Sequence, residues 1–261
     1  MSKRRSASWT GRAGADGRQW RHVLEDAELQ RQFRMIAYDL PYHGKSLPPT
    51  SVRWWESEYR LTKEFLIETV MAISHALELD RPVYMGCSIG GHLAPDLALA
   101  HPDEFSAVIG INAGLATALE GNTDTADSWY HPRVSNDWKA AAMLGNTAPT
   151  SPEAYRRETT WIYSQGAPPA LKGDVFYYSR GHDLTAEQAA RIDTSKVAVY
   201  LLTGEYDALA GEDGTARLAR SIPGSHFELI AGMGHFGPSE NPEDFKPALT
   251  AVLAKIAAAR P

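Results

Sequence analysis

The stretch PVYMGCSIG, residues 82–90, decides the fold of this chain. Its apolar start indicates a buried strand, and residues 86–90 follow as Gly-Cys-Ser-Ile-Gly. A serine can project its hydroxyl above the end of a buried strand only where the chain turns sharply, and glycines on both sides let the strand and the next helix approach closely. The pattern predicts that Ser88 is a nucleophile on a strand-to-helix elbow. A Gly- and Ser-rich loop between two elements is the alternative interpretation.

Apolar runs alternate with helical patterns along the rest of the chain. Strands that are rich in Val, Ile and Leu and alternate with helices indicate a parallel sheet buried on both faces. The sequence therefore predicts the α/β class, a mostly parallel sheet with helices on both faces. Residues just beyond the strands are the candidates for function, because ligands bind at the carboxyl ends of such strands. The expected strands are 33–39, 107–111, 197–203 and 227–230, and the expected helices are 61–79 and 90–100.

Residues 115–191 break this alternation, with many Pro, Gly and aromatic residues. A structureless loop of that length is uncommon in a compact domain, so we expect a mainly helical inserted cap. The core is then formed by residues 1–114 and 192–261. Trp129, Trp138 and Trp161 are candidates for lining a substrate pocket, and the alternative is that these rings form the core of the cap.

Composition excludes several classes of function. A net charge of −6 argues against general affinity for nucleic acid or an anionic membrane, and no apolar run approaches the ~20 residues of a membrane span. The single cysteine, Cys87, excludes an internal disulfide and favours a cytoplasmic protein. Metal-type spacings such as HExxH and CxxC are absent from the sequence. We expect a small-molecule substrate and neither a metal nor an organic cofactor.

A serine hydroxyl is a weak nucleophile until a base removes its proton, and the base needs a third group that fixes its tautomer. Asp207 follows strand 197–203 and His235 follows strand 227–230, so the chain order is Ser, Asp, His. Asp207 can also be read as a turn residue that caps the helix from about Gly211. The remaining alternatives are Glu205 as the acid, and His92, His182 or His226 as the base.

Four motifs in this order resemble those of the α/β-hydrolase fold superfamily, in its serine esterase and lipase-like branch. They are DLPYHGKS at 39–46, GCSIG at 86–90, GEYD at 204–207, and GHF at 234–236 followed by SENP at 239–242. The resemblance implies that Ser88 is the nucleophile, Asp207 the orienting acid and His235 the base. It implies hydrolysis of a carboxylic ester or lactone through an acyl-enzyme. Carbon-carbon hydrolysis of a vinylogous diketone, another activity of this superfamily, is the alternative.

The resemblance also implies an oxyanion hole with two backbone donors. The N–H of Ile89 is one, because it begins the helix after the elbow. Residues 11–20 resemble the loop that supplies the other, with Arg12 or Ala13 as the donor. Residues 1–10 are polar and basic, so we expect the strand before this loop to be missing, in a truncated chain or a short branch. A catalytically impaired binding form is therefore a further hypothesis.

Overall fold

A computed structural model describes residues 5–10, 15–47, 50, 51, 53, 56–116, 130, 133, 135–182 and 184–259. The strands in these ranges form one six-stranded sheet in the order β2, β1, β3, β4, β5, β6, and every neighbouring pair is parallel. The strands are β1 (Arg5–Thr10), β2 (Phe33–Tyr38), β3 (Val83–Cys87), β4 (Ala107–Ile111), β5 (Ala198–Gly204) and β6 (His226–Ile230). Because all six run in one direction, their carboxyl ends share one edge of the sheet.

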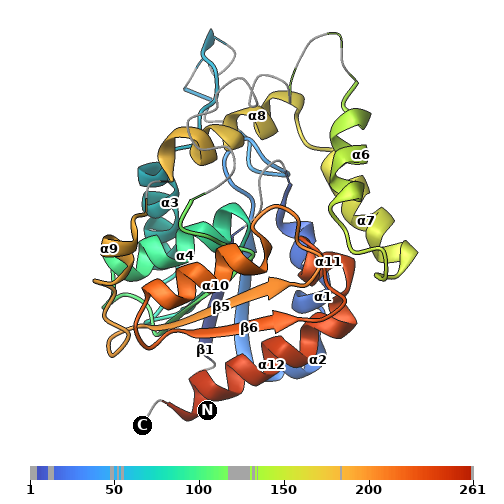
Figure 1. Ribbon diagram of the computed structural model, residues 1–261. Coiled ribbons are helices and arrows are strands. Elements are labelled where there is room, and N and C mark those ends of the chain that lie inside the picture. Colours follow the sequence, from blue (N-terminus) through green and yellow to red (C-terminus); the bar gives the residue numbers. More distant parts are fainter. Residues whose placement is uncertain are drawn as a thin grey trace.

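Helices cover both faces of the sheet (Figure 1). Side chains alternate between the two faces of a strand, so Tyr84 packs with the cluster that includes Leu93 and Leu218, while Met85 packs with the cluster that includes Phe245 and Leu249. The first face carries α3 (Lys63–Ala76), α4 (Ile89–Ala100), α9 (Ala186–Ala189) and α10 (Gly211–Ser221), and the second carries α1 (Arg21–Leu24), α2 (Ala27–Gln32) and α12 (Pro242–Ala258). None of the described helices is long and apolar enough to cross a membrane.

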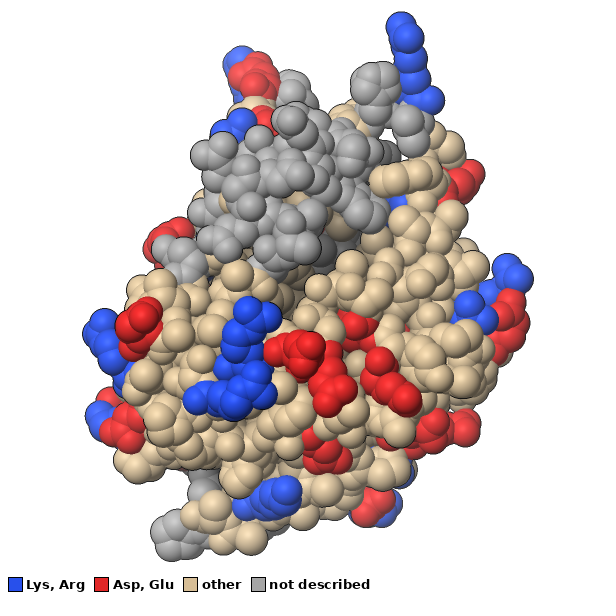
Figure 2. All heavy atoms as spheres, viewed as in Figure 1, with Lys and Arg blue, Asp and Glu red and all other residues tan. Residues whose placement is uncertain are grey.

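These elements confirm the predicted α/β class and the predicted strands and helices, with boundaries that differ by at most three residues. The face in Figure 2 shows acidic and basic side chains next to each other over the region of α10 and α12.

The expectation that no strand precedes the loop at residues 11–20 was wrong. Residues 5–10 form β1, which pairs with β2 over its whole length and with β3 from Ala7 to Thr10. The sequence RSASWT has no apolar run, and for that reason hydrophobic periodicity missed it. Ladder hydrogen bonds join backbone groups, so a polar sequence can occupy a strand that has partners on both sides.

Between β4 and β5, the described residues form four helices and a π-helical turn. They are α6 (Asp137–Gly145), α7 (Glu153–Ser164), α8 (Pro168–Phe176), the π-helical turn η3 (Tyr177–Gly181) and α9. In Figure 1, α8 runs across the top of the molecule, and α6 and α7 stand as a pair above α11 (Gly237–Glu240) and η1 (Gly17–Trp20). α7 thus packs on α11 and η1, and α6 packs on α7.

We call the stretch from α6 to η3 the helical segment, and the six strands with the helices that cover them the sheet domain. A buried carboxylate joins the two. Asp174 of α8 accepts hydrogen bonds from Nε2 of His43 at 2.7 Å and from the hydroxyl of Tyr59 at 3.0 Å. His43 follows β2, and Nδ1 of its ring lies 3.0 Å from the carbonyl of Pro41. The His43 and Asp174 side chains are 1% and 0% exposed. Burial opposes protonation of His43, but the charge and hydrogen bond of Asp174 outweigh it and raise the pKa of His43.

We predict that His43→Gln makes the free energy of unfolding less dependent on pH. A histidine whose pKa is raised on folding stabilises the protein fully below its ordinary pKa of 6.5, and this stabilisation is lost as the pH rises through the folded pKa. The stability difference between wild type and variant should therefore be larger near about pH 6 than near about pH 9 in urea denaturation. His75→Gln is the matched control, because His75 and Glu104 form an exposed pair. A difference for His43→Gln that grows with pH would contradict this prediction.

Candidate active site

The turn between β3 and α4 has the geometry of an elbow. β3 ends at Cys87 and α4 begins at Ile89, and the residue between them, Ser88, has φ of 56° and ψ of −115°. This left-handed backbone costs a residue other than glycine about 1–3 kcal/mol. A Cβ atom on Gly86 would overlap the carbonyl carbon and oxygen of Gly90, so only glycine fits before the turn. The buried serine is thus held at the carboxyl end of a central strand.

Asp207 and His235 are in contact across two neighbouring strand ends. Nδ1 of His235 lies 2.8 Å from Oδ1 of Asp207, and the two side chains are 4% and 0% exposed. Asp207 follows β5 and His235 follows β6, and these strands pair in register, so both residues emerge at the same edge of the sheet. Burial would raise the pKa of Asp207, but the attraction and hydrogen bond of His235 outweigh it and hold that pKa below its ordinary value. The carboxylate therefore stays ionised at neutral pH.

The residues that the sequence offered as the alternative acid and bases make other contacts. Glu205 is exposed, and its Oε2 accepts from the N–H of Gly232 at 2.8 Å. His226 stands at the amino end of β6 and stacks on Tyr200 with ring centroids 4.8 Å apart. Nδ1 of His92 and Nε2 of His182 are 3.0 Å apart, and both lie close to the carbonyl of Gly114. Asp207 is therefore the candidate acid that contacts His235.

The hydroxyl of Ser88 pairs with a residue of the helical segment. Oγ of Ser88 lies 2.6 Å from the hydroxyl of Tyr178, in the π-helical turn after α8. In the part of the chain that the structure describes, no hydrogen bond joins Ser88 to His235. The structure thus brings Asp207 and His235 together and places Ser88 against Tyr178, a contact that the sequence analysis did not predict.

The expected oxyanion donors are only partly within the described residues. Ile89 is the first residue of α4, where backbone N–H groups have no acceptor within the helix and the helix dipole favours negative charge. Arg12 and Ala13 lie outside the described residues. The structure describes the following turn, in which the side chain of Asp16 accepts from the N–H of Arg18 at 3.0 Å at the start of η1.

Two of the three predicted pocket tryptophans lie at the surface. Trp138 is 44% exposed, and Trp161 is 55% exposed with the guanidinium of Arg18 over its ring at 5.2 Å. Trp161 belongs to the face of α7 opposite the buried residues Ile162 and Thr159, a direction that aromatic content could not reveal. Trp129 lies outside the described residues.

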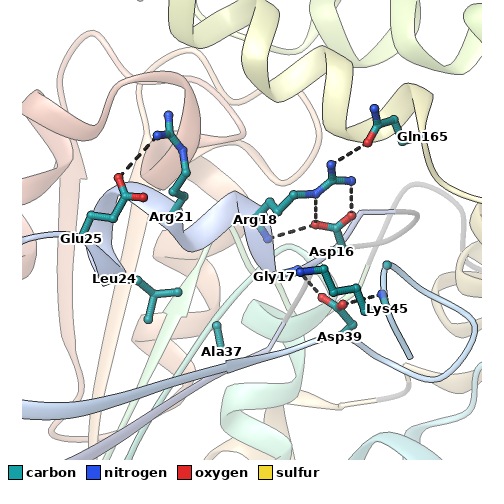
Figure 3. A pocket seen from close by; sticks show the side chains of 11 residues that line it. Asp16, Gly17, Arg18, Arg21, Leu24, Glu25, Ala37, Asp39, Lys45 and Gln165 are labelled. Carbon is teal, nitrogen blue, oxygen red and sulfur yellow. Dashed lines mark hydrogen bonds and ion pairs between the residues drawn. The ribbon is translucent and has the colours of Figure 1, made fainter. Parts of the chain in front are cut away.

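A hollow of about 580 Å³ lies beside the loop that follows β2 (Figure 3). Asp39 accepts hydrogen bonds from the backbone N–H of Gly17 at 2.6 Å and of Lys45 at 2.8 Å, so it joins two loops at one wall. Arg18 reaches across the hollow to Gln165 after α7. Asp39, the first residue of the motif at 39–46, therefore holds these two loops together. No group of three or more His, Cys, Asp and Glu side chains in the described ranges is arranged to hold a metal ion.

Comparison with known proteins identifies the family. The sequence profile described as alpha/beta hydrolase fold matches residues 10–140, half of the chain. The chain belongs to the alpha/beta hydrolase fold family. This match begins at the last residue of β1 and includes the elbow at Ser88.

Similar proteins cover nearly the whole of this alpha/beta hydrolase. RutD of Caulobacter vibrioides, provisionally named a carbamate hydrolase, is 23% identical over 92% of this chain and 87% of its own. The 3-oxoadipate enol-lactonase 2 of Acinetobacter baylyi is 24% identical over 88% of this chain and 82% of its own. The crystal structure of the enol-lactonase from Burkholderia xenovorans LB400 superposes with a TM-score of 0.81, 19% identity, and coverage of 97% of this chain and 92% of that one. The protein is a hydrolase of the alpha/beta fold.

Asn112 supports the loop that carries His235, and the sequence analysis did not identify Asn112. It follows β4, is fully buried, and has φ of 54°. Its Nδ2 donates to the carbonyl of His235 at 2.7 Å, and its Oδ1 accepts from the N–H of Gly204 at 3.0 Å. One side chain therefore joins the ends of β4 and β5 to the histidine loop. Its place directly after a predicted strand was the available signal.

Glu240 holds the same loop from the other side. This carboxylate is 0% exposed, and its oxygens accept hydrogen bonds from backbone groups on both flanks of His235. The donors are the N–H groups of Gly234 at 2.5 Å, Phe236 at 3.2 Å and Ala148 at 3.2 Å, and the hydroxyl of Ser151 at 3.2 Å. Since a carboxylate accepts up to four hydrogen bonds, Glu240 satisfies this set and links the loop to the segment after α6.

We predict that Glu240→Ala lowers the free energy of unfolding of the hydrolase by at least about 3 kcal/mol, because several buried donors lose their acceptor. Urea denaturation followed by circular dichroism measures the change. Glu243→Ala is the matched control on the neighbouring helix, because Glu243 makes an exposed hydrogen bond to Tyr155. The control should change stability by less than about 1 kcal/mol. Equal effects of the two substitutions would refute the structural role given to Glu240.

Proposed function

We propose that the protein is a serine hydrolase that cleaves a carboxylic ester or lactone of a small molecule through an acyl-enzyme. The observation that carries the proposal is the buried 2.8 Å pair of His235 and Asp207, beside an elbow that holds Ser88 in a left-handed backbone. An ionised acid that holds the Nδ1 side of a histidine leaves its Nε2 free to take a proton from a serine. The lactonase names of two similar proteins support the lactone as a substrate class.

In the proposed reaction, Nε2 of His235 removes the proton of Ser88 while Oγ attacks the acyl carbon. The resulting oxyanion is stabilised by the N–H of Ile89 and a donor from the loop at residues 11–20, where Ala13 is our candidate. His235 then gives its proton to the departing alcohol or ring oxygen. A water molecule attacks the acyl-enzyme with the same histidine as the base, which releases the acid and restores Ser88.

Asp207 orients His235 and stabilises its protonated form during both steps. Asn112 and Glu240 act through the loop that carries His235, by fixing its backbone on two sides. In the resting structure Ser88 pairs with Tyr178, and catalytic hydrogen bonds often tighten only when substrate binds. We further propose that the helical segment within residues 115–191 serves as a cap over Ser88, a role supported by this contact.

We predict that Ser88→Ala abolishes labelling by a fluorophosphonate and lowers turnover of short p-nitrophenyl esters by at least about 10³-fold, since the acyl-enzyme can no longer form. Initial rates and in-gel labelling measure both effects. The control is Cys87→Ala, which removes the neighbouring buried thiol and should leave turnover within about fivefold. Labelling and turnover that are equal in wild type and Ser88→Ala would disprove the serine mechanism. A wild type that hydrolyses a vinylogous diketone and no ester would instead disprove the ester or lactone as the substrate class.

A second prediction separates the two carboxylates after β5. Asp207→Asn should lower kcat by about 10³- to 10⁴-fold, because an amide neither holds His235 in the required tautomer nor stabilises its charge. Glu205→Gln is the matched control two residues away and should keep kcat within about threefold, because the exposed Glu205 contacts a backbone N–H. Comparable losses in both variants, at unchanged melting temperatures, would show that Asp207 is not the orienting acid.

A further inference from the structure

Tyr178 is a second polar group at the reacting centre. Its hydroxyl lies 2.6 Å from Oγ of Ser88, a short distance for a hydrogen bond between two hydroxyls, and both residues are buried. The two residues are 90 positions apart in the chain. Tyr178 comes from the helical segment between β4 and β5, whereas the acid and base candidates come from loops after strands of the sheet. The helical segment thus supplies a group in direct contact with the candidate nucleophile.

The ring of Tyr178 is held by other buried rings. It packs edge-on against His92 of α4 with centroids 5.4 Å apart, and against Tyr177 with centroids 5.7 Å apart. Tyr177 is anchored in turn, because its hydroxyl lies 3.4 Å from Oδ2 of Asp96 and 3.2 Å from Nδ1 of His182. A hydroxyl on a ring that is fixed in this way is preorganised, so it need not reorient when charge develops during a reaction.

The phenol of Tyr178 keeps its proton. Burial raises its pKa well above the ordinary value of 10.0, and the hydrogen bond with Ser88 opposes this rise only in part. In the proposed mechanism the proton of Ser88 goes to His235, so the hydroxyl of Ser88 donates in that direction. Oγ can then accept the hydrogen bond in which Tyr178 donates, because a hydroxyl oxygen has two acceptor positions.

We propose that Tyr178 is a catalytic residue that donates a hydrogen bond to the reacting oxygens during acylation. This inference rests on the proposed serine mechanism. As the bond from Oγ to the acyl carbon forms, the proton of Ser88 passes to His235 and the carbonyl π electrons move to the carbonyl oxygen. Tyr178 keeps its proton throughout, donating first to Oγ and then to the substrate oxygen that gains negative charge. No group is transferred to or from the phenol.

The position of the phenol explains why this donor matters. An acyl carbon bonded to Oγ can place one of its oxygens within hydrogen-bond range of a hydroxyl that lies 2.6 Å from Oγ. A donor in a buried site stabilises charge there far more than it would in water. The helical segment would therefore contribute to acylation itself, besides enclosing the substrate. One described donor, Tyr178, would then come from outside the sheet domain.

The test is the acylation rate of Tyr178→Phe, measured as the burst of p-nitrophenol from a short p-nitrophenyl ester and as the rate of fluorophosphonate labelling. The substitution removes one hydroxyl and keeps the ring, so the packing on His92 remains. We expect acylation about 10- to 100-fold slower with KM within about threefold of wild type. Tyr200→Phe is the matched control, a buried tyrosine on the other sheet face, and should acylate at the wild-type rate. Melting temperatures of both variants verify folding.

The outcomes separate this inference from the proposed function. If wild type is labelled and turns over, and Tyr178→Phe does both at the same rate or faster, the phenol is not a catalytic donor, while the serine mechanism stands. If wild type is neither labelled nor active on esters or lactones, the proposed function fails and this inference fails with it. A slowed Tyr178→Phe beside an unchanged Tyr200→Phe supports both.

Discussion

The close approach of two backbone segments at the elbow is the constraint on which the site depends. The absence of a side chain at Gly86 lets the backbone of Gly90 lie against the end of β3, and Gly91 packs in the same way against the carbonyl of Ile111 in β4. These contacts force the residue between strand and helix into a left-handed backbone, at a cost of about 1–3 kcal/mol. Packing of the surrounding sheet and α4 offsets that cost. Ser88 thereby stands at the carboxyl edge of a buried strand, and Ile89 begins the helix that follows.

The parallel sheet turns positions far apart in the sequence into neighbours. β3, β4, β5 and β6 pair in order and in one direction, so the residues that follow them gather along one edge. The residues at this edge are Ser88 of the elbow, Asn112, Asp207 and His235. Each is then fixed by short-range bonds, with Asn112 and Glu240 holding the loop of His235 on two sides. Backbone direction brings these groups close, and buried hydrogen bonds set their geometry.

The helical segment between β4 and β5 is joined to this edge by polar contacts as well as apolar ones. Asp174 binds His43 and Tyr59, and four residues later Tyr178 reaches Ser88. Both contacts come from one continuous stretch, α8 and the π-helical turn after it. Asp174 also interacts electrostatically with Tyr178. The position of this stretch over the sheet domain is therefore coupled to the surroundings of Ser88.

The sequence by itself determined the α/β class, the elbow at Ser88 and the order of Asp207 and His235, because buried strands and their ends leave local patterns of apolar residues and glycine. It did not reveal β1, whose polar residues are held by backbone pairing with two other strands. Only the tertiary structure decided between Asp207 and Glu205 as the partner of His235, and only it brought Tyr178 and Asn112 to the site. Those contacts join residues that are distant in the chain, and their distances depend on how helices and loops pack, which no local pattern encodes.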